Sequence, residues 1–269
     1  MTWYYVDKLI MTPGPTDIPL RIRLAMIREV VNPDLDPVFM ELYKAVVEKL
    51  KKLVNASRYD IQVLLGEAML GLEASIANLI KPGEKVLVVA NGVFGEGFKD
   101  LVRMYGGEPI VWESDWRRAV DPNEFEKVLE KNRDVKAVTI VHCDTPSAIL
   151  NPVEELARIA DDYGVISIVD SVSAIGGIPI DVERGKIDIL IGGSQKVLNL
   201  PAGLTILAIS EKALEAIEKR DYQGFYLNLK LWRDMLKEGI FPYTHNDMLI
   251  RGTQRITKHD IRRRTRKRL

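Results

Sequence analysis

"ILIGGSQKVLNLPAGLTIL" (residues 189–207) contains two apolar runs with one lysine between them. The β-branched residues of both runs predict buried strands, and the loop that joins them holds Pro201 and Gly203. A lysine that only keeps the surface solvated needs no such position, whereas a lysine that reacts with a carbonyl group does. Lys196 is therefore the first candidate catalytic residue.

Short apolar runs alternate with amphipathic segments along the rest of the chain. Strands are predicted at residues 61–65, 86–90, 136–142, 165–170, 187–192 and 204–209. Helices are predicted at residues 38–54, 71–80, 95–105, 122–131, 153–163 and 211–220. Strand–helix–strand units repeated in this way indicate an α/β fold with a mostly parallel central sheet and helices on both faces.

The composition restricts the class of protein further. Of the 269 residues, 46% are hydrophobic and 28% charged, which is ordinary for a globular domain. The formal net charge is zero, so nothing favours nucleic acid or a membrane as a partner. A single cysteine, Cys143, excludes an internal disulfide. Because we find neither a signal-peptide pattern nor an apolar run of about 20 residues, we expect a cytoplasmic protein.

Polar side chains follow three of the predicted strands. Residues 142–145 come after one strand, Asp170 ends the next, and Lys196 follows a third. About one strand–helix–strand unit separates each from the next, so parallel strands would bring all three to the carboxyl edge of the sheet, where ligands bind. There a lysine can form a Schiff base with an aldehyde cofactor, and an aspartate can pair with a protonated ring nitrogen. His142 alone supports no metal site.

Six motifs occur in order along the chain: TPGPTDIP (12–19), GEAMLGLEA (66–74), NGVFGE (91–96), HCDTPSAILNP (142–152), VDSVSAIGG (169–177) and GSQKVLNLPAG (193–203). Together they resemble the class V branch of the pyridoxal-phosphate-dependent, fold-type I enzymes, in particular the alanine–glyoxylate and serine–pyruvate aminotransferases. The resemblance covers residues 12 to about 244. It implies the fold-type I large domain and pyridoxal 5'-phosphate as the cofactor.

The resemblance implies roles for the residues around the cofactor ring. Lys196 stands at the Schiff-base position and would also move a proton between the substrate and the cofactor. Asp170 would hold the pyridine nitrogen protonated, which makes the ring an electron sink. Val172 would contact one face of the ring and Phe94 the other. Thr145 would lie beside the phenolic edge of the ring.

The phosphate end of the site departs from the family pattern. Gln195 stands beside the lysine, and the backbone amides of Ala68 and Met69 at a helix N-terminus would bind the phosphate. Relatives often have small hydroxyl and glycine residues here, whereas this chain has Glu67. A carboxylate beside a phosphate dianion is unfavourable, so we expect Glu67 to point away.

The resemblance also predicts the domain organisation. Thr244 matches a threonine that reaches the phosphate of the neighbouring subunit, which implies a homodimer. We divide the chain into an N-terminal arm (1–20), a cofactor-binding large domain (21–244) and a basic divergent tail (245–269). The usual C-terminal small domain, with its arginine for the substrate carboxylate, would then be missing, and a shifted reading frame is one hypothesis for the tail.

Two functions remain open from the sequence. The first is transamination of a small amino acid, alanine or serine, to glyoxylate or pyruvate through a Lys196 Schiff base. The second is a truncated homologue that binds the cofactor but turns over little or not at all, because the carboxylate-binding arginine is missing. A cysteine desulfurase fits poorly, since Gln195 rather than histidine precedes the lysine and Cys143 lies at a strand end.

Overall fold

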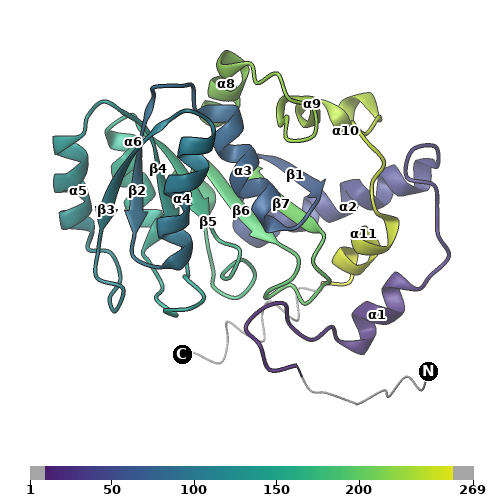
Figure 1. Cartoon of the computed structure of the whole chain (residues 1–269). Helices are drawn as coiled ribbons and strands as arrows, with labels where there is room; N and C mark the ends of the chain where they lie inside the picture. The colour runs from purple at the N-terminus through teal and green to yellow at the C-terminus, as the bar shows by residue number, and fades with distance from the viewer. Residues whose placement is uncertain (1–9, 257–269) are drawn as a thin grey trace, which may run out of the picture.

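The computed structural model of the protein describes residues 10–256 and has a seven-stranded sheet at its centre (Figure 1). The strand order is β1-β7-β6-β5-β4-β2-β3, and only β7 runs antiparallel to its neighbours. The strands are β1 (Asp60–Leu65), β2 (Lys85–Ala90), β3 (Glu108–Glu113), β4 (Val135–Val141), β5 (Ile166–Asp170), β6 (Ile189–Gly193) and β7 (Leu204–Ile209). The predicted α/β fold with a mostly parallel sheet is confirmed.

Helices cover both faces of this sheet (Figure 1). Helices α3 and α4 pack on one face, and α6 packs on the other face between α5 and α7. The helices are α1 (Leu20–Met26), α2 (Pro37–Val54), α3 (Ala68–Leu79), α4 (Val93–Met104), α5 (Pro122–Lys131), α6 (Val153–Asp162), α7 (Val182–Gly185), α8 (Glu211–Arg220), α9 (Lys230–Arg233), α10 (Met235–Glu238) and α11 (Asp247–Gln254). Within residues 10–256 we find no helix with the length and apolar character that crossing a bilayer requires.

The sequence pattern explains why these segments take these forms. Every residue of β5, β6 and β7 is buried, as expected for strands with helices on both sides. In α6 the buried residues Val153, Leu156, Ala157 and Ala160 share one helical face, and the acidic residues of its first turn lie at the favourable end of the helix dipole. The six predicted strands and six predicted helices are all present, with ends shifted by a few residues.

The edge strand β3 was not predicted from the sequence. Its residues, EPIVWE, carry a glutamate at each end and Pro109 near the start, and none of them is fully buried. A proline weakens any prediction of a strand because it donates no backbone hydrogen bond. It is tolerated here because β3 pairs only with β2 at the edge of the sheet.

The segment predicted to be a basic tail is partly folded into the domain. Residues Asp247–Gln254 form α11, which packs against α1 and α2 and buries Leu249 and Ile250. His245, just before it, is also buried, and its Nε2 lies 2.9 Å from the carbonyl oxygen of Val63. All basic residues of 245–269 except Arg251 and Arg255 come after Ile256, so the charge that suggested a tail lies outside the described residues.

Removing side-chain atoms from the buried face of α11 should destabilise the whole domain. Ile250 is fully buried, so Ile250→Ala should lower the free energy of unfolding by about 2–5 kcal/mol. Met248 is 44% exposed on the same helix, so Met248→Ala should change it by no more than about 0.5 kcal/mol. Urea denaturation of both variants tests this, and equal effects would contradict the packing of α11.

Candidate active site

Six of the seven strands end at one edge of the sheet, and a cavity of about 270 Å³ lies there beside the ends of five of them. Strands β2, β4, β5 and β6 run parallel, and β1 shares their direction because both β1 and β6 are antiparallel to β7. The loops after these strands therefore converge, as expected for the ligand-binding edge of an open α/β sheet. The predicted residues that line the cavity are Ala68, Met69, Phe94, Thr145, Asp170, Val172, Gln195 and Lys196.

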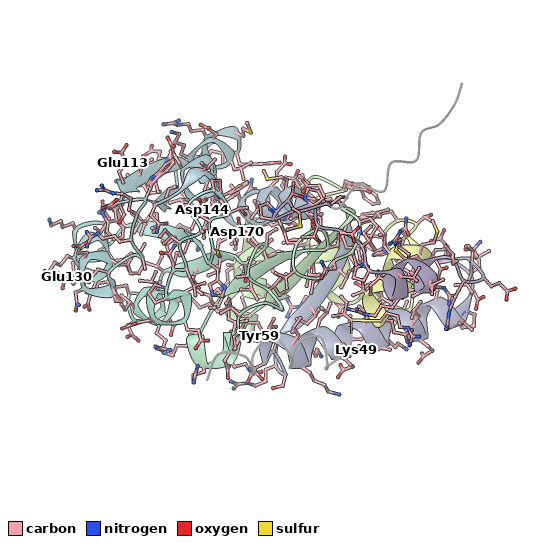
Figure 2. The ribbon with its side chains drawn as sticks, turned by 90° about the horizontal axis from the view of Figure 1, so that it is seen from below. Lys49, Tyr59, Glu113, Glu130, Asp144 and Asp170 are labelled. Carbon is pink, nitrogen blue, oxygen red and sulfur yellow. The ribbon has the colours of Figure 1, made fainter. Side chains whose placement is uncertain are left out.

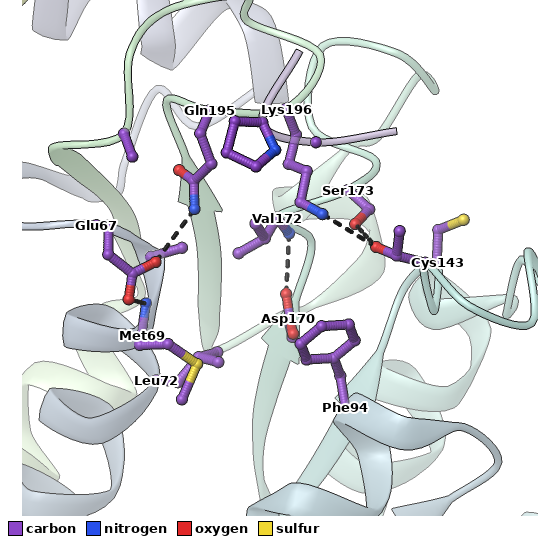
Figure 3. Close-up of a pocket in the computed structure, with 15 residues that line it drawn as sticks. Glu67, Met69, Leu72, Phe94, Cys143, Asp170, Val172, Ser173, Gln195 and Lys196 are labelled. Carbon is purple, nitrogen blue, oxygen red and sulfur yellow. Dashed lines mark hydrogen bonds between the residues drawn. The ribbon is translucent and has the colours of Figure 1, made fainter. Parts of the chain in front are cut away.

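Lys196 projects into this cavity from the loop after β6 (Figure 3). Its Nζ donates a 3.3 Å hydrogen bond to Oγ1 of Thr145, which lies 2.5 Å from Oγ of Ser173. The backbone of the lysine is held by Thr16, whose Oγ1 donates to the Lys196 carbonyl oxygen at 3.0 Å. The amine is thus placed by a strand end, two hydroxyl groups and the N-terminal segment.

The N-terminal segment closes directly over the lysine at Gly14, where any larger residue would have to displace the end of the Lys196 side chain. A Cβ atom on Gly14 would lie 2.0 Å from Cδ and 2.9 Å from Nζ of Lys196. Gly14 and Pro15 both line the cavity, as do Leu72, Cys143, Ser173 and Ala202, none of which was assigned to the site from the sequence. The TPGPTDIP motif was the available signal for the first two residues, but it did not show which of its residues reaches the lysine.

Asp170 is the buried carboxyl group of the cavity, at the end of β5. Its Oδ1 accepts a 2.9 Å hydrogen bond from the backbone N–H of Val172. Burial raises the pKa of Asp170 to about 6, and the nearby Asp144 also raises it, while the Val172 hydrogen bond and the positive charge of Lys196 lower it. Figure 2 shows Asp144 and Asp170 close together inside the molecule, far from the peripheral Glu130.

Phe94 and Val172 are the apolar side chains on either side of the aspartate. Val172 is almost fully buried, whereas Phe94 is 39% exposed and its ring lies beside Asp170 (Figure 3). Phe94 opens the first turn of α4, where its N–H donates a 3.0 Å hydrogen bond to Oδ1 of Asp144. The sheet edge thus presents apolar surface next to a carboxyl group, which suits a flat ring with one basic nitrogen.

At the opposite end of the cavity, Glu67 does not point away as predicted. It lines the cavity, and its Oε1 accepts the N–H of Met69 at 3.0 Å while its Oε2 accepts Nε2 of Gln195 at 3.2 Å (Figure 3). The carboxylate points inward because it caps α3, whose first N–H groups need acceptors. The Met69 amide that was predicted to bind phosphate is therefore already used within the chain.

Two polar residues that were considered from the sequence, Thr244 and His142, lie outside the cavity. Thr244 does not line it; its hydroxyl donates to Oδ2 of Asp34 at 2.7 Å on the exposed surface, and its contact with a partner subunit stays a prediction. His142 is buried, with Nδ1 2.9 Å from Oγ of Ser171, and burial lowers its pKa to about 4. His142 is thus neutral and structural. Among residues 10–256 no cluster of three or more histidine, cysteine, aspartate or glutamate side chains could hold a metal ion.

Comparison with known proteins identifies the family. The family model described as Aminotransferase class-V matches residues 28–255, which is most of the chain. The chain belongs to the class V aminotransferases. It is 35% identical to the pyridoxamine–pyruvate transaminase of Mesorhizobium japonicum and 32% identical to the serine–glyoxylate aminotransferase of Methylorubrum extorquens, over 92% and 87% of its length.

The likeness of this class V chain extends to three dimensions. The crystal structure of pyridoxamine–pyruvate aminotransferase from Mesorhizobium loti matches it with a TM-score of 0.88 and 30% identity over 98% of the chain. The chain covers 67% of that structure, and it spans 64% and 60% of the lengths of the two sequence relatives. The shared fold therefore comprises the sheet and the helices described here.

Class V aminotransferases depend on pyridoxal phosphate, and the cavity fits the two ends of that molecule differently. The end formed by Asp170 and Lys196 suits the pyridine ring and its carbonyl group, because it offers a buried carboxyl group and an amine. The end formed by Glu67 does not suit a phosphate, because a carboxylate occupies the helix N-terminus that would bind it.

The buried Asp170 should make stability depend on pH in a defined direction. Its pKa is higher in the folded protein (about 6) than the ordinary value of 3.8, so ionisation costs stability progressively as pH rises from 3.8 to about 6. Asp170→Asn removes this cost and should raise the free energy of unfolding above pH 6 by up to about 3 kcal/mol. The advantage should shrink toward pH 4. Urea denaturation at several pH values tests it, and a pH-independent difference would contradict the assignment.

Proposed function

We propose that this chain carries the catalytic cavity of an aminotransferase that moves the amino group of a small amino acid, alanine or serine, to glyoxylate or pyruvate. The observation that carries the proposal is the convergence of Lys196 and Asp170 on one small cavity from adjacent strand ends. The relatives support the choice of substrates, because one is a pyridoxamine–pyruvate transaminase and another a serine–glyoxylate aminotransferase.

Each polar residue of the cavity would have a separate role around the ring of the cofactor. When bound, a pyridoxal group supplies an electrophilic carbonyl carbon and a ring that accepts electrons released at the substrate α-carbon. Lys196 would present its amine to the carbonyl carbon and would afterwards hold the proton removed from the α-carbon. Asp170 would accept a hydrogen bond from the ring N–H and so keep that nitrogen protonated. Thr145 and Ser173 orient the amine.

A second candidate function is binding of the cofactor with little turnover. Among the described residues that line the cavity none is an arginine, so no side chain there offers the paired donors that hold a carboxylate. A substrate that is bound without orientation loses much of the rate that proximity provides. Both candidate functions require the chemistry of Lys196. They differ only in whether the bound cofactor responds to amino acids.

We further infer a cytoplasmic homodimer in which Thr244 contacts the phosphate end of the partner's site. Support for an interface comes from exposed apolar side chains on and just after α1. Leu20 is 62%, Ile27 75% and Val30 67% exposed to solvent. Such a group on one side of a domain is more typical of a protein contact than of free surface.

Replacing Lys196 should abolish cofactor chemistry without unfolding the protein. We expect wild type with pyridoxal or pyridoxal phosphate to develop a visible absorption band that Lys196→Ala lacks. Lys44→Ala is the matched control, because the side chain of this lysine is 45% exposed on α2 and pairs with Glu41. Circular dichroism of all three proteins checks the fold.

The response to amino acids separates the two functions. If alanine or serine abolishes the lysine-dependent band, the chain carries out the first half of a transamination. A band that persists with every amino acid indicates binding with little turnover. A spectrum that is the same in wild type and Lys196→Ala contradicts both functions.

A further inference from the structure

The end of the cavity that faces α3 is lined by hydrogen-bond acceptors. Both oxygens of Glu67 are held in place, one by the N–H of Met69 at 3.0 Å and the other by Nε2 of Gln195 at 3.2 Å. These two hydrogen bonds hold the carboxylate of Glu67 toward the cavity, although the residue as a whole is exposed. Any ligand group that reaches this end must therefore meet a negative charge.

Gln195 strengthens this acceptor character. Its side chain is 93% buried, and because Nε2 must face the carboxylate of Glu67 to donate, the amide oxygen Oε1 is left as the second polar atom. Oε1 is buried without a hydrogen-bond partner among the described residues. Buried polar atoms normally have partners, so an unpartnered acceptor beside the cavity indicates a ligand or water that donates a hydrogen bond.

A phosphate ester fits this end poorly for two physical reasons. Its oxygens accept hydrogen bonds, whereas the Met69 N–H, one of the two backbone amides predicted to donate to it, is already bonded to Glu67. Its two negative charges would also lie beside the carboxylate, and like charges a few ångströms apart repel strongly near a protein surface. Lys196, at the carbonyl end, is the only basic side chain among the described residues that line the cavity.

A neutral hydroxymethyl group fits the same end well. Its hydroxyl can donate a hydrogen bond to the carboxylate of Glu67, and its oxygen can accept one from water or from the protein. A hydrogen bond to a charged acceptor is stronger than one between neutral groups, so a single hydroxyl gains appreciable binding energy there.

We propose that this cavity selects the unphosphorylated form of the pyridoxal and pyridoxamine group, with Glu67 accepting a hydrogen bond from its hydroxymethyl group. The inference rests on the proposed function, because Lys196 and Asp170 must hold the ring at the other end. Glu67 is thus a specificity-determining residue that distinguishes a free alcohol from its phosphate ester.

Calorimetric titration of the full chain with pyridoxamine and with pyridoxamine phosphate tests the selectivity. The amine forms are used because they bind without a covalent bond to Lys196 and differ only in the phosphate. We expect wild type to bind pyridoxamine at least about tenfold more tightly than its phosphate ester. Glu67→Gln, which keeps an acceptor for Met69 but removes the charge, should shift the ratio of the two dissociation constants at least about tenfold toward the phosphate.

A matched variant and the lysine experiment make the outcome decisive. Glu73→Gln carries the same substitution on the same helix, where Glu73 bonds the Tyr105 hydroxyl outside the cavity, and should leave the ratio unchanged. A wild type that prefers the phosphate ester overturns the inference, as does a ratio that Glu67→Gln does not move. In either case a lysine-dependent band with pyridoxal or its phosphate leaves the proposed function standing. If neither aldehyde gives that band, the proposed function fails and the inference fails with it.

Discussion

The alignment of the parallel strands β4, β5 and β6 is the constraint on which the cavity depends. Val141 pairs with Asp170, and Asp170 pairs with Ile191, so the three strands end almost level. The ladder continues one step beyond the strands, since His142 N–H donates to the Asp170 carbonyl oxygen at 2.7 Å. A slip of one residue would turn the Asp170 side chain to the opposite face of the sheet. The position of the carboxyl group relative to Lys196 thus follows from backbone hydrogen bonds.

The two ends of the cavity at this edge carry different charged groups: Asp170 and Lys196 lie at one end, and Glu67 lies at the other. The Asp170 carboxyl group is buried beneath Val172 and raised in pKa, while Glu67 is tethered at the mouth by Met69 and Gln195. The Lys196 amine donates a hydrogen bond to the hydroxyl group of Thr145. A ligand that satisfies all three positions must carry a basic ring nitrogen, a carbonyl or amino group, and a donor at the far end. This combination restricts the ligand more than any single residue does.

Segments distant in sequence close the site and hold the domain together at that side. Gly14 lies directly against the Lys196 side chain, and the Thr16 hydroxyl bonds the lysine backbone. Next to this arm, α1 packs on α11, so the first and last described elements form one unit beside β1 and β7 (Figure 1). The segment that covers the lysine is therefore anchored through a helix from the other end of the chain.

The sequence by itself determined the α/β architecture and the positions of Lys196 and Asp170, because both follow from local patterns. Alternating apolar runs specify strands, and residues at the ends of parallel strands must meet at one edge. Only the tertiary structure decided the orientation of Glu67, the close approach of Gly14 and the folding of α11. Glu67 bonds Gln195, Gly14 lies against Lys196, and α11 packs on α1 and α2. These partners are more than a hundred positions apart in the sequence, so no local pattern encodes the contacts. Charge density suggested a basic divergent tail from residue 245, whereas Ile250 is buried where α11 packs on α1 and α2.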